Sequence, residues 1–186
     1  MTSVDDINSL ESEAGIIASL IHKPDFIFYS EYLLPNHFTN KENRCVYTAI
    51  GDLVSRGITT VDPYNIIESL NASEATRKYA DELSVEKLNE LMEMSDVLAR
   101  HTPEEYKMLV DNVMDAAFRR DTFQRLKECQ ALCYNRAETN VEEKIYSIID
   151  DVMTEFSTAN DVPMFKDVVD DCWDEIQSRQ GDGYAG

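Results

Sequence analysis

Residues that interrupt helices are scarce in this chain, which has only six glycines and five prolines in 186 residues. This scarcity leaves few turns, while Leu, Ile, Met, Glu and Asp are abundant. Hydrophobic residues make up 43% of the chain and charged residues 28%, a composition typical of an ordered protein that can bury a core. We therefore expect an all-α protein.

Basic residues are also scarce, with 17 Lys and Arg against 36 Asp and Glu and a net charge of -19. Because phosphate binding needs clustered Lys and Arg to displace counterions, the chain is not expected to wrap nucleic acid by itself. Acid-rich surfaces also occur in proteins that imitate DNA. An acidic helical adaptor or DNA mimic that binds a basic nucleic-acid-binding partner therefore remains an alternative function.

The motifs of the common catalytic centres are missing from the sequence. There is no GxxxxGK[ST] phosphate-binding loop and no His-Glu-x-x-His, so no catalytic, cofactor-binding or metal-binding residues are predicted, and the chain is not expected to be an enzyme. The three histidines, expected to be caps or surface residues, are His22, His37 and His101. The cysteines lack zinc-site spacing. Of these, Cys129 and Cys133 are expected in the core.

Targeting and membrane segments are not found either. The first residues carry no positive charge typical of a secretory signal, and no apolar run reaches the roughly 18 residues of a membrane span. These features predict a cytoplasmic protein with reduced thiols and no membrane association.

Helix start and stop signals divide the chain into three parts, of which residues 1–102 form the first. An apolar helix ending at Pro24 is expected there, followed by a short helix from Phe26 to Leu34. Later signals are a capping-box spacing from Thr39 to Glu42, a C-cap glycine at Gly57, and helix starts at Asp62 and Ser84. Together they predict a globular N-terminal helical bundle.

Residues 103–158 predict a long antiparallel helical hairpin. No glycine or proline lies between Pro103 and Pro163, so one helix is expected from Pro103 through Arg136, roughly 50 Å long. A turn then precedes a return helix. Both arms carry broad apolar stripes, so we expect a two-fold contact with a second copy of the chain, unless the bundle covers them. The expected contact residues are Phe118, Phe123, Ile145, Ile148, Ile149, Val152 and Phe156.

Residues 159–186 predict a linker with one amphipathic helix and a flexible glycine-rich tail. Its apolar residues recur at i, i+3, i+4, i+7 and i+11, which places them on one helical stripe. They are Phe165, Val168, Val169, Cys172 and Ile176. Such a stripe docks either on another subunit or a separate domain, or back onto the core of its own chain.

Several short segments, in order, resemble the N-terminal domain of DnaB-type replicative DNA helicases. They are Glu13–Ile21, Pro35–Phe38, Asn43–Ile50, Gly57 and Val61-Asp62, with Thr102-Pro103, Tyr106 and Arg119-Arg120 before the hairpin. Residues 72–95 depart from the family pattern, and the Gly-Gly segment often found after the Asp62 helix is missing. The acidity and brevity of this region favour a phage or prophage version.

The resemblance implies a non-catalytic N-terminal collar that mediates oligomerisation, either as a dimer or as a trimer of dimers that forms a hexamer. It implies primase and a helicase loader as partners, and a linker helix that docks on the neighbouring subunit's ATPase domain. By the same resemblance, ATP and Mg²⁺ belong to a motor domain absent from this chain, and DNA is contacted only through that domain.

Overall fold

The computed structural model describes residues 7–72, 74–80 and 83–157, and it contains helices but no strand within these ranges. The predicted all-α class is therefore confirmed. The α-helices are α1 (Leu10–His22), α2 (Lys41–Ser55), α3 (Pro63–Ala72), α4 (Glu74–Ala80), α5 (Val85–Leu98), α6 (Pro103–Tyr134) and α7 (Val141–Ser157), and two short 3₁₀ helices are η2 (Pro24–Tyr29) and η3 (Pro35–His37). None of the described helices is both long enough and apolar enough to span a membrane.

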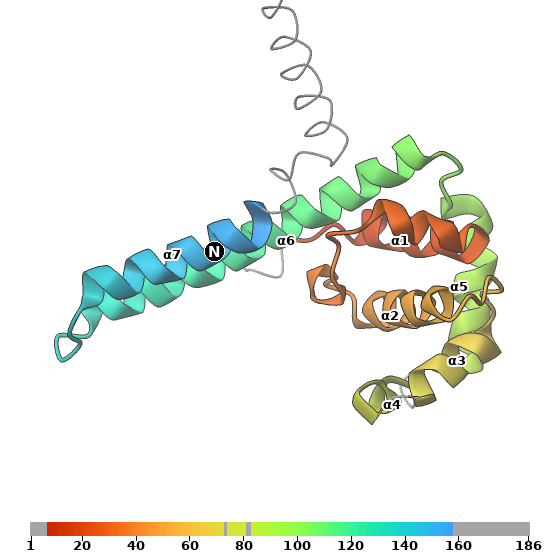
Figure 1. Cartoon of the computed structure of the whole chain (residues 1–186), viewed down its shortest axis with the longest axis horizontal. Helices are drawn as coiled ribbons and strands as arrows, with labels where there is room; N and C mark the ends of the chain where they lie inside the picture. Colours follow the sequence, from red (N-terminus) through yellow and green to blue (C-terminus); the bar gives the residue numbers. More distant parts are fainter. Residues whose placement is uncertain (1–6, 73, 81–82, 158–186) are drawn as a thin grey trace, which may run out of the picture.

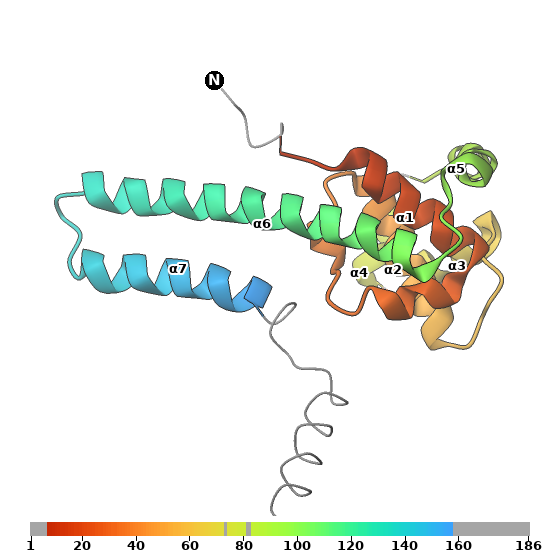
Figure 2. The ribbon, with the colours of Figure 1, turned by 90° about the horizontal axis from the view of Figure 1, so that it is seen from above.

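The molecule consists of a globular bundle from which a helical hairpin projects (Figure 1). The first part of α6 packs on α1 within the bundle, and the rest of α6 extends beyond it. In Figure 2, α7 runs antiparallel beside this extension. The bundle-plus-hairpin arrangement matches the sequence prediction, and the 32 residues of α6 make a rod of about 48 Å.

Helix α1 lies at the centre of the bundle, in contact with α2, α5, α6 and η2. Its residues Ile16, Ile17 and Leu20 are essentially inaccessible to solvent. Gly15 lets α6 approach closely, because a Cβ there would lie only 2.8 Å from the Leu109 side chain. The apolar spacing of α1 thus supplies the core against which the other bundle helices pack.

Hydroxyl groups of α2 and α6 fix the segment between η2 and η3. The Tyr47 hydroxyl donates to the Leu33 carbonyl at 3.0 Å, and the hydroxyls of Tyr47 and Tyr106 each lie 3.2 Å from Ser30 Oγ. Burial is the main cause that raises the pKa of both tyrosines. Because each buried hydroxyl has a partner, these contacts hold the segment before η3 in a defined position.

Two local predictions differ from the structure. The short helix expected from Phe26 to Leu34 is instead η2, which ends at Tyr29, and a separate η3 that starts at Pro35. Proline disfavours helical geometry in the residue before it, which explains the break ahead of Pro35. Helix α2 is capped by Asn40, whose side chain accepts from the Asn43 N–H at 3.0 Å, rather than by Thr39.

Candidate interaction surface

The hairpin is the surface that the sequence singled out, and the structure forms it from α6 and α7. Thr102 caps α6 by accepting the Glu105 N–H at 3.3 Å, and Pro103 occupies the first turn, where its missing N–H costs nothing. Asn140 takes a positive φ of 57° just before α7, a conformation that Asn tolerates better than most residues. These local features explain where the hairpin turns.

The predicted contact residues contribute first to the packing of the two arms on each other. Val152 is only 3% exposed within its own chain, so it belongs to the seam between α6 and α7. The other predicted residues are partly buried: Phe118, Phe123, Ile145, Ile148, Ile149 and Phe156. Five of the seven come from α7, and Ile145, Ile148, Val152 and Phe156 share the i, i+3, i+7, i+11 stripe of a single helix face.

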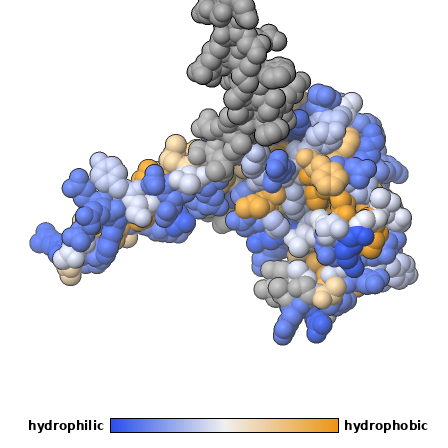
Figure 3. All heavy atoms as spheres, in the orientation of Figure 1, coloured by the Kyte–Doolittle hydropathy of each residue, from blue (hydrophilic) through white to orange (hydrophobic). Residues whose placement is uncertain are grey.

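Several large apolar side chains outside that stripe are exposed on the part of the hairpin that projects beyond the bundle. They are Leu126 at 52%, Tyr134 at 79%, Tyr146 at 70% and Met153 at 54%. On the face seen in Figure 3, orange side chains on the hairpin are few and separated by hydrophilic ones, whereas on the bundle they gather into larger patches. The sequence prediction did not include Tyr146 and Met153, whose seven-residue spacing places them on one face of α7.

Cation pairing stiffens the middle of α6. The Arg125 guanidinium lies 3.7 Å from Asp121 and 3.4 Å from Glu128 on the same helix. Asp121 is the largest cause that raises the pKa of Arg125, followed by Glu128, and Asp151 from α7 acts in the same direction. One cation therefore interacts with carboxylates from both arms of the hairpin.

The return arm meets the bundle at an aromatic junction. The Phe156 ring lies 5.5 Å from the His37 ring of η3 and 5.3 Å from the Phe118 ring of α6 in an edge-to-face arrangement. These three residues come from three separate segments. Since α7 otherwise packs on α6, the junction is where the end of α7 is positioned relative to the bundle.

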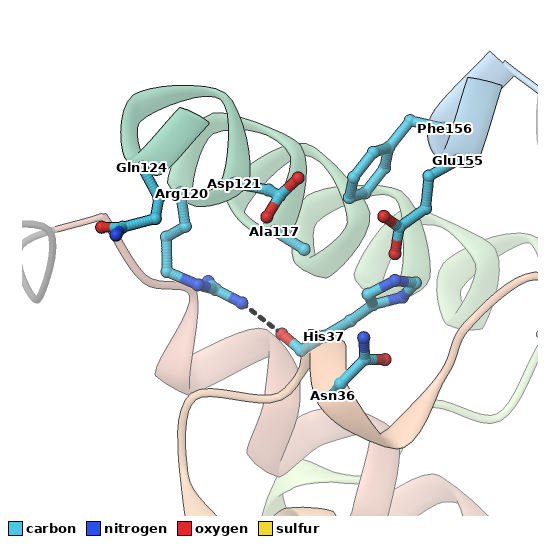
Figure 4. A pocket seen from close by; sticks show the side chains of 8 residues that line it. All are labelled: Asn36, His37, Ala117, Arg120, Asp121, Gln124, Glu155 and Phe156. Carbon is cyan, nitrogen blue, oxygen red and sulfur yellow. Dashed lines mark hydrogen bonds between the residues drawn. The ribbon is translucent and has the colours of Figure 1, made fainter. Parts of the chain in front are cut away.

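A pocket of ≈ 260 Å³ lies at this junction (Figure 4). Figure 4 shows Arg120 entering from α6 with its guanidinium toward the His37 carbonyl, to which it donates a hydrogen bond. Arg120 also donates to the Ile7 carbonyl at 3.3 Å. Burial is the main cause that lowers the pKa of Arg120, and the Glu13 carboxylate opposes this effect.

His37 is buried, with 4% of its surface exposed, so it is not a surface histidine, but its side chain caps the start of η3, the other role expected for it. Its Nδ1 lies 3.1 Å from the Leu34 N–H and must accept from it, so the neutral ring carries its proton on Nε2. Burial, and then the nearby Arg120, lower the pKa of His37 to about 4. The imidazole is therefore neutral at physiological pH.

Glu13 is a second buried group that the sequence did not single out. Its two carboxylate oxygens accept the N–H groups of Thr39 and Asn40 at 2.7 and 2.9 Å, although the residue has no exposed surface. It thereby supplements the cap at the start of α2. The sequence signal that could have identified Glu13 as buried is its position on an apolar helix, three and four residues before Ile16 and Ile17.

The remaining predicted groups are separate. Cys129 is buried as expected, but Cys133, one turn nearer the end of α6, is exposed, which contradicts the prediction of a core position. Among the described residues, no three His, Cys, Asp or Glu side chains are grouped in a way that could hold a metal ion. The linker residues Phe165, Val168, Val169, Cys172 and Ile176 lie outside the described residues.

Comparisons with known proteins agree with the sequence resemblance. Residues 5–112 match the family described as DnaB-like helicase N terminal domain. The fold is similar to the crystal structure of the N-terminal domain of DnaB helicase from Mycobacterium tuberculosis, with a TM-score of 0.62 and 20% sequence identity. That similarity covers 78% of this chain and 97% of the other. No curated protein sequence gives a significant match.

Proposed function

The chain belongs to the family of DnaB-like helicase N-terminal domains, and from that premise we propose that it forms the N-terminal collar of a replicative DNA helicase. In this role it joins subunits through its hairpin and docks a primase or a helicase loader, with no catalytic centre of its own. ATP and Mg²⁺ then act in a separate motor domain, which also contacts DNA. The net charge of -19 supports a collar that does not itself bind phosphate.

The observation that carries this proposal is the projecting hairpin with apolar side chains on its outside. Leu126, Tyr146 and Met153 are more than half exposed, although they lie on well-formed helices. Burying a large apolar side chain fully is worth about 1.5–3 kcal/mol, so covering the exposed half of three such residues contributes about 3 kcal/mol per copy. A two-fold contact counts that contribution twice, which helps to offset the entropy lost on association.

The oligomerisation part is tested by sedimentation velocity over a range of concentrations. Met153→Asp places a charge on the exposed face of α7 and should shift the protein toward monomer. Met108→Asp is the matched control, because Met108 is similarly exposed, at 65% against 54%, and lies on the part of α6 that packs in the bundle. A wild-type protein that stays monomeric at the highest concentration, or a Met153→Asp variant that assembles unchanged, would reject the hairpin as the contact.

The docking part is tested with the primase and the loader of the same replication system. Each purified protein is added to the chain, and binding is measured by isothermal titration calorimetry. Binding of at least one supports the collar role. Absence of binding by both, in a preparation that oligomerises through the hairpin, would leave the chain an assembly domain without the docking role.

A further inference from the structure

Helix α5 stands at the side of the bundle and packs mainly on α1 (Figure 2). Among its residues, only Leu88 and Ser95 are fully buried. The Ser95 hydroxyl lies 2.9 Å from His22 Nε2, and the same nitrogen lies 3.3 Å from the Asp96 carboxylate. These contacts hold one face of α5 against the bundle, Leu91 and Met92 are partly buried against the core, and Met94 is exposed beside them.

A groove of ≈ 340 Å³ runs between α1 and α5 beside the start of α2. Leu91, Met94 and Leu98 line it from α5 at i, i+3 and i+7, and Leu10 and Ala14 line it from α1 at i and i+4. Leu10 and Met94 are 46% and 59% exposed. Apolar side chains from both helices therefore line one hollow, which can accept large apolar side chains of a partner helix.

The rim of the groove is acidic. Glu86, Glu90 and Glu93 are exposed and recur at i, i+4 and i+7, which places them on the solvent side of the α5 apolar row. Lys87 forms a 2.6 Å ion pair with Glu42 across the end of the groove, so this cation is matched by an acid of α2. Glu90 lines the groove, so the α5 border places negative charge beside the apolar side chains, within a chain that is itself strongly acidic.

We propose that this groove is a docking site for a basic amphipathic helix of a partner protein. One or two large apolar side chains of that helix insert between Leu91 and Met94 on α5 and Leu10 on α1. Lys or Arg residues on its flanks face the three glutamates of α5. The acidic border favours this partner over a second copy of the chain, because two acidic rims would repel each other. The inference rests on the proposed docking function and specifies the surface and the chemistry of the partner.

The test uses the full chain and two designed helical peptides with the same number of lysines. One peptide carries leucines along one face, and the other carries glutamines at those positions. We expect the leucine peptide to bind at least about tenfold more tightly and to shift the NMR signals of the methyl groups of Leu91, Met94 and Leu10. Added salt should weaken its binding, because the acidic rim contributes attraction between exposed charges.

The decisive variant is Met94→Glu, which adds a negative charge inside the groove. A purely electrostatic attraction would become stronger, whereas loss of an apolar anchor should weaken binding of the leucine peptide tenfold or more. Met108→Glu is the matched control, since it adds the same charge at a similarly exposed methionine outside the groove. Circular dichroism checks that both variants remain helical, and Leu91→Gln gives a second, uncharged test of the same groove.

Three outcomes would overturn the proposal. These are equal binding of the two peptides, equal effects of Met94→Glu and Met108→Glu, and methyl shifts confined to the hairpin. Concentration-dependent shifts at the groove without any peptide would instead assign it to a second copy of the chain. Sedimentation of Met94→Glu separates this inference from the collar proposal, because assembly through the hairpin should be unchanged when only the groove is altered.

Discussion

Replacing Phe156 by alanine should release the end of the return helix from the bundle while the bundle stays folded. The Phe156 ring is the contact between α7 and both His37 and Phe118, at 5.5 and 5.3 Å. Truncation of a fully buried Phe costs about 3–5 kcal/mol, and a partly buried one about half of that. The two aromatic pairs add about 0.5–1.5 kcal/mol each. We therefore expect a local loss of about 3 kcal/mol.

Hydrogen exchange measured by mass spectrometry resolves this effect by segment. A loss of about 3 kcal/mol in a local opening equilibrium corresponds to roughly a hundredfold faster exchange. We expect this acceleration in peptides from the C-terminal half of α7, with little change in peptides from α1. Phe28→Ala is the matched control, because the Phe28 side chain is 71% exposed and its truncation should leave exchange in both segments unchanged.

Two results would refute this reasoning. Unchanged exchange in α7 would show that the aromatic junction does not hold the arm. Equal acceleration in α7 and α1 would show that hairpin and bundle open as one cooperative unit, so that the junction has no separate role. Phe156→Leu distinguishes ring contacts from volume, because it keeps much of the apolar contact but removes both aromatic pairs.

Three further predictions concern groups of the bundle. The pKa of His37 is lowered to about 4 in the folded protein, below its usual 6.5. The unfolded state therefore binds more protons between these two pH values. As the pH drops through this window, the free energy of unfolding should fall by at most about 3 kcal/mol. His37→Gln should remove that part of the slope in urea unfolding at stepwise pH, and parallel profiles of variant and wild type would contradict it. Glu13→Gln should lower the free energy of unfolding by about 2 kcal/mol, because it places an amide where two backbone N–H groups need acceptors. In the same urea assay, the control Glu11→Gln should change this free energy little, because Glu11 is exposed. Gly57→Ala should lower the thermal midpoint by the equivalent of about 1 kcal/mol, since φ is +77°, and an unchanged or raised midpoint would exclude strain there.

Features that depend on a few neighbouring residues could be predicted from the sequence. The cap at Ser84 accepts the Lys87 N–H at 3.2 Å, and Gly57 ends α2 with positive φ, as their positions indicated. The long α6 followed from the absence of glycine and proline after Pro103. Each of these signals acts within one helical turn, or within one uninterrupted helix, so the local sequence contains the whole cause.

The junction and the groove could not be predicted in the same way, because they form where distant segments meet. Nothing near His37 in the sequence shows that α6 will bring Arg120 to its carbonyl or that α7 will lay Phe156 against its ring. Likewise, the sequence predicted a helix after Ser84 and an apolar helix before Pro24, but the groove between them depends on how Leu88 and Ser95 are buried in the bundle. The periodicity of a sequence identifies the apolar face of a helix, but only the packing of distant segments determines whether that face is buried.

A polar residue at a position predicted to be buried gives partial information on contacts between distant segments. Glu13 lies on a helix whose neighbouring positions Ile16 and Ile17 are fully buried, and an acid in such a place must find hydrogen-bond donors or destabilise the fold. The sequence therefore indicates that Glu13 needs hydrogen-bond donors, although it does not show where they come from. In the structure the donors are backbone N–H groups at the start of α2, and the Arg120 guanidinium lies nearby. Since Arg120 also holds the His37 carbonyl, the acid that caps α2 is linked through one guanidinium to the junction that positions α7. A change at Glu13 should consequently affect how the end of α7 packs on the bundle.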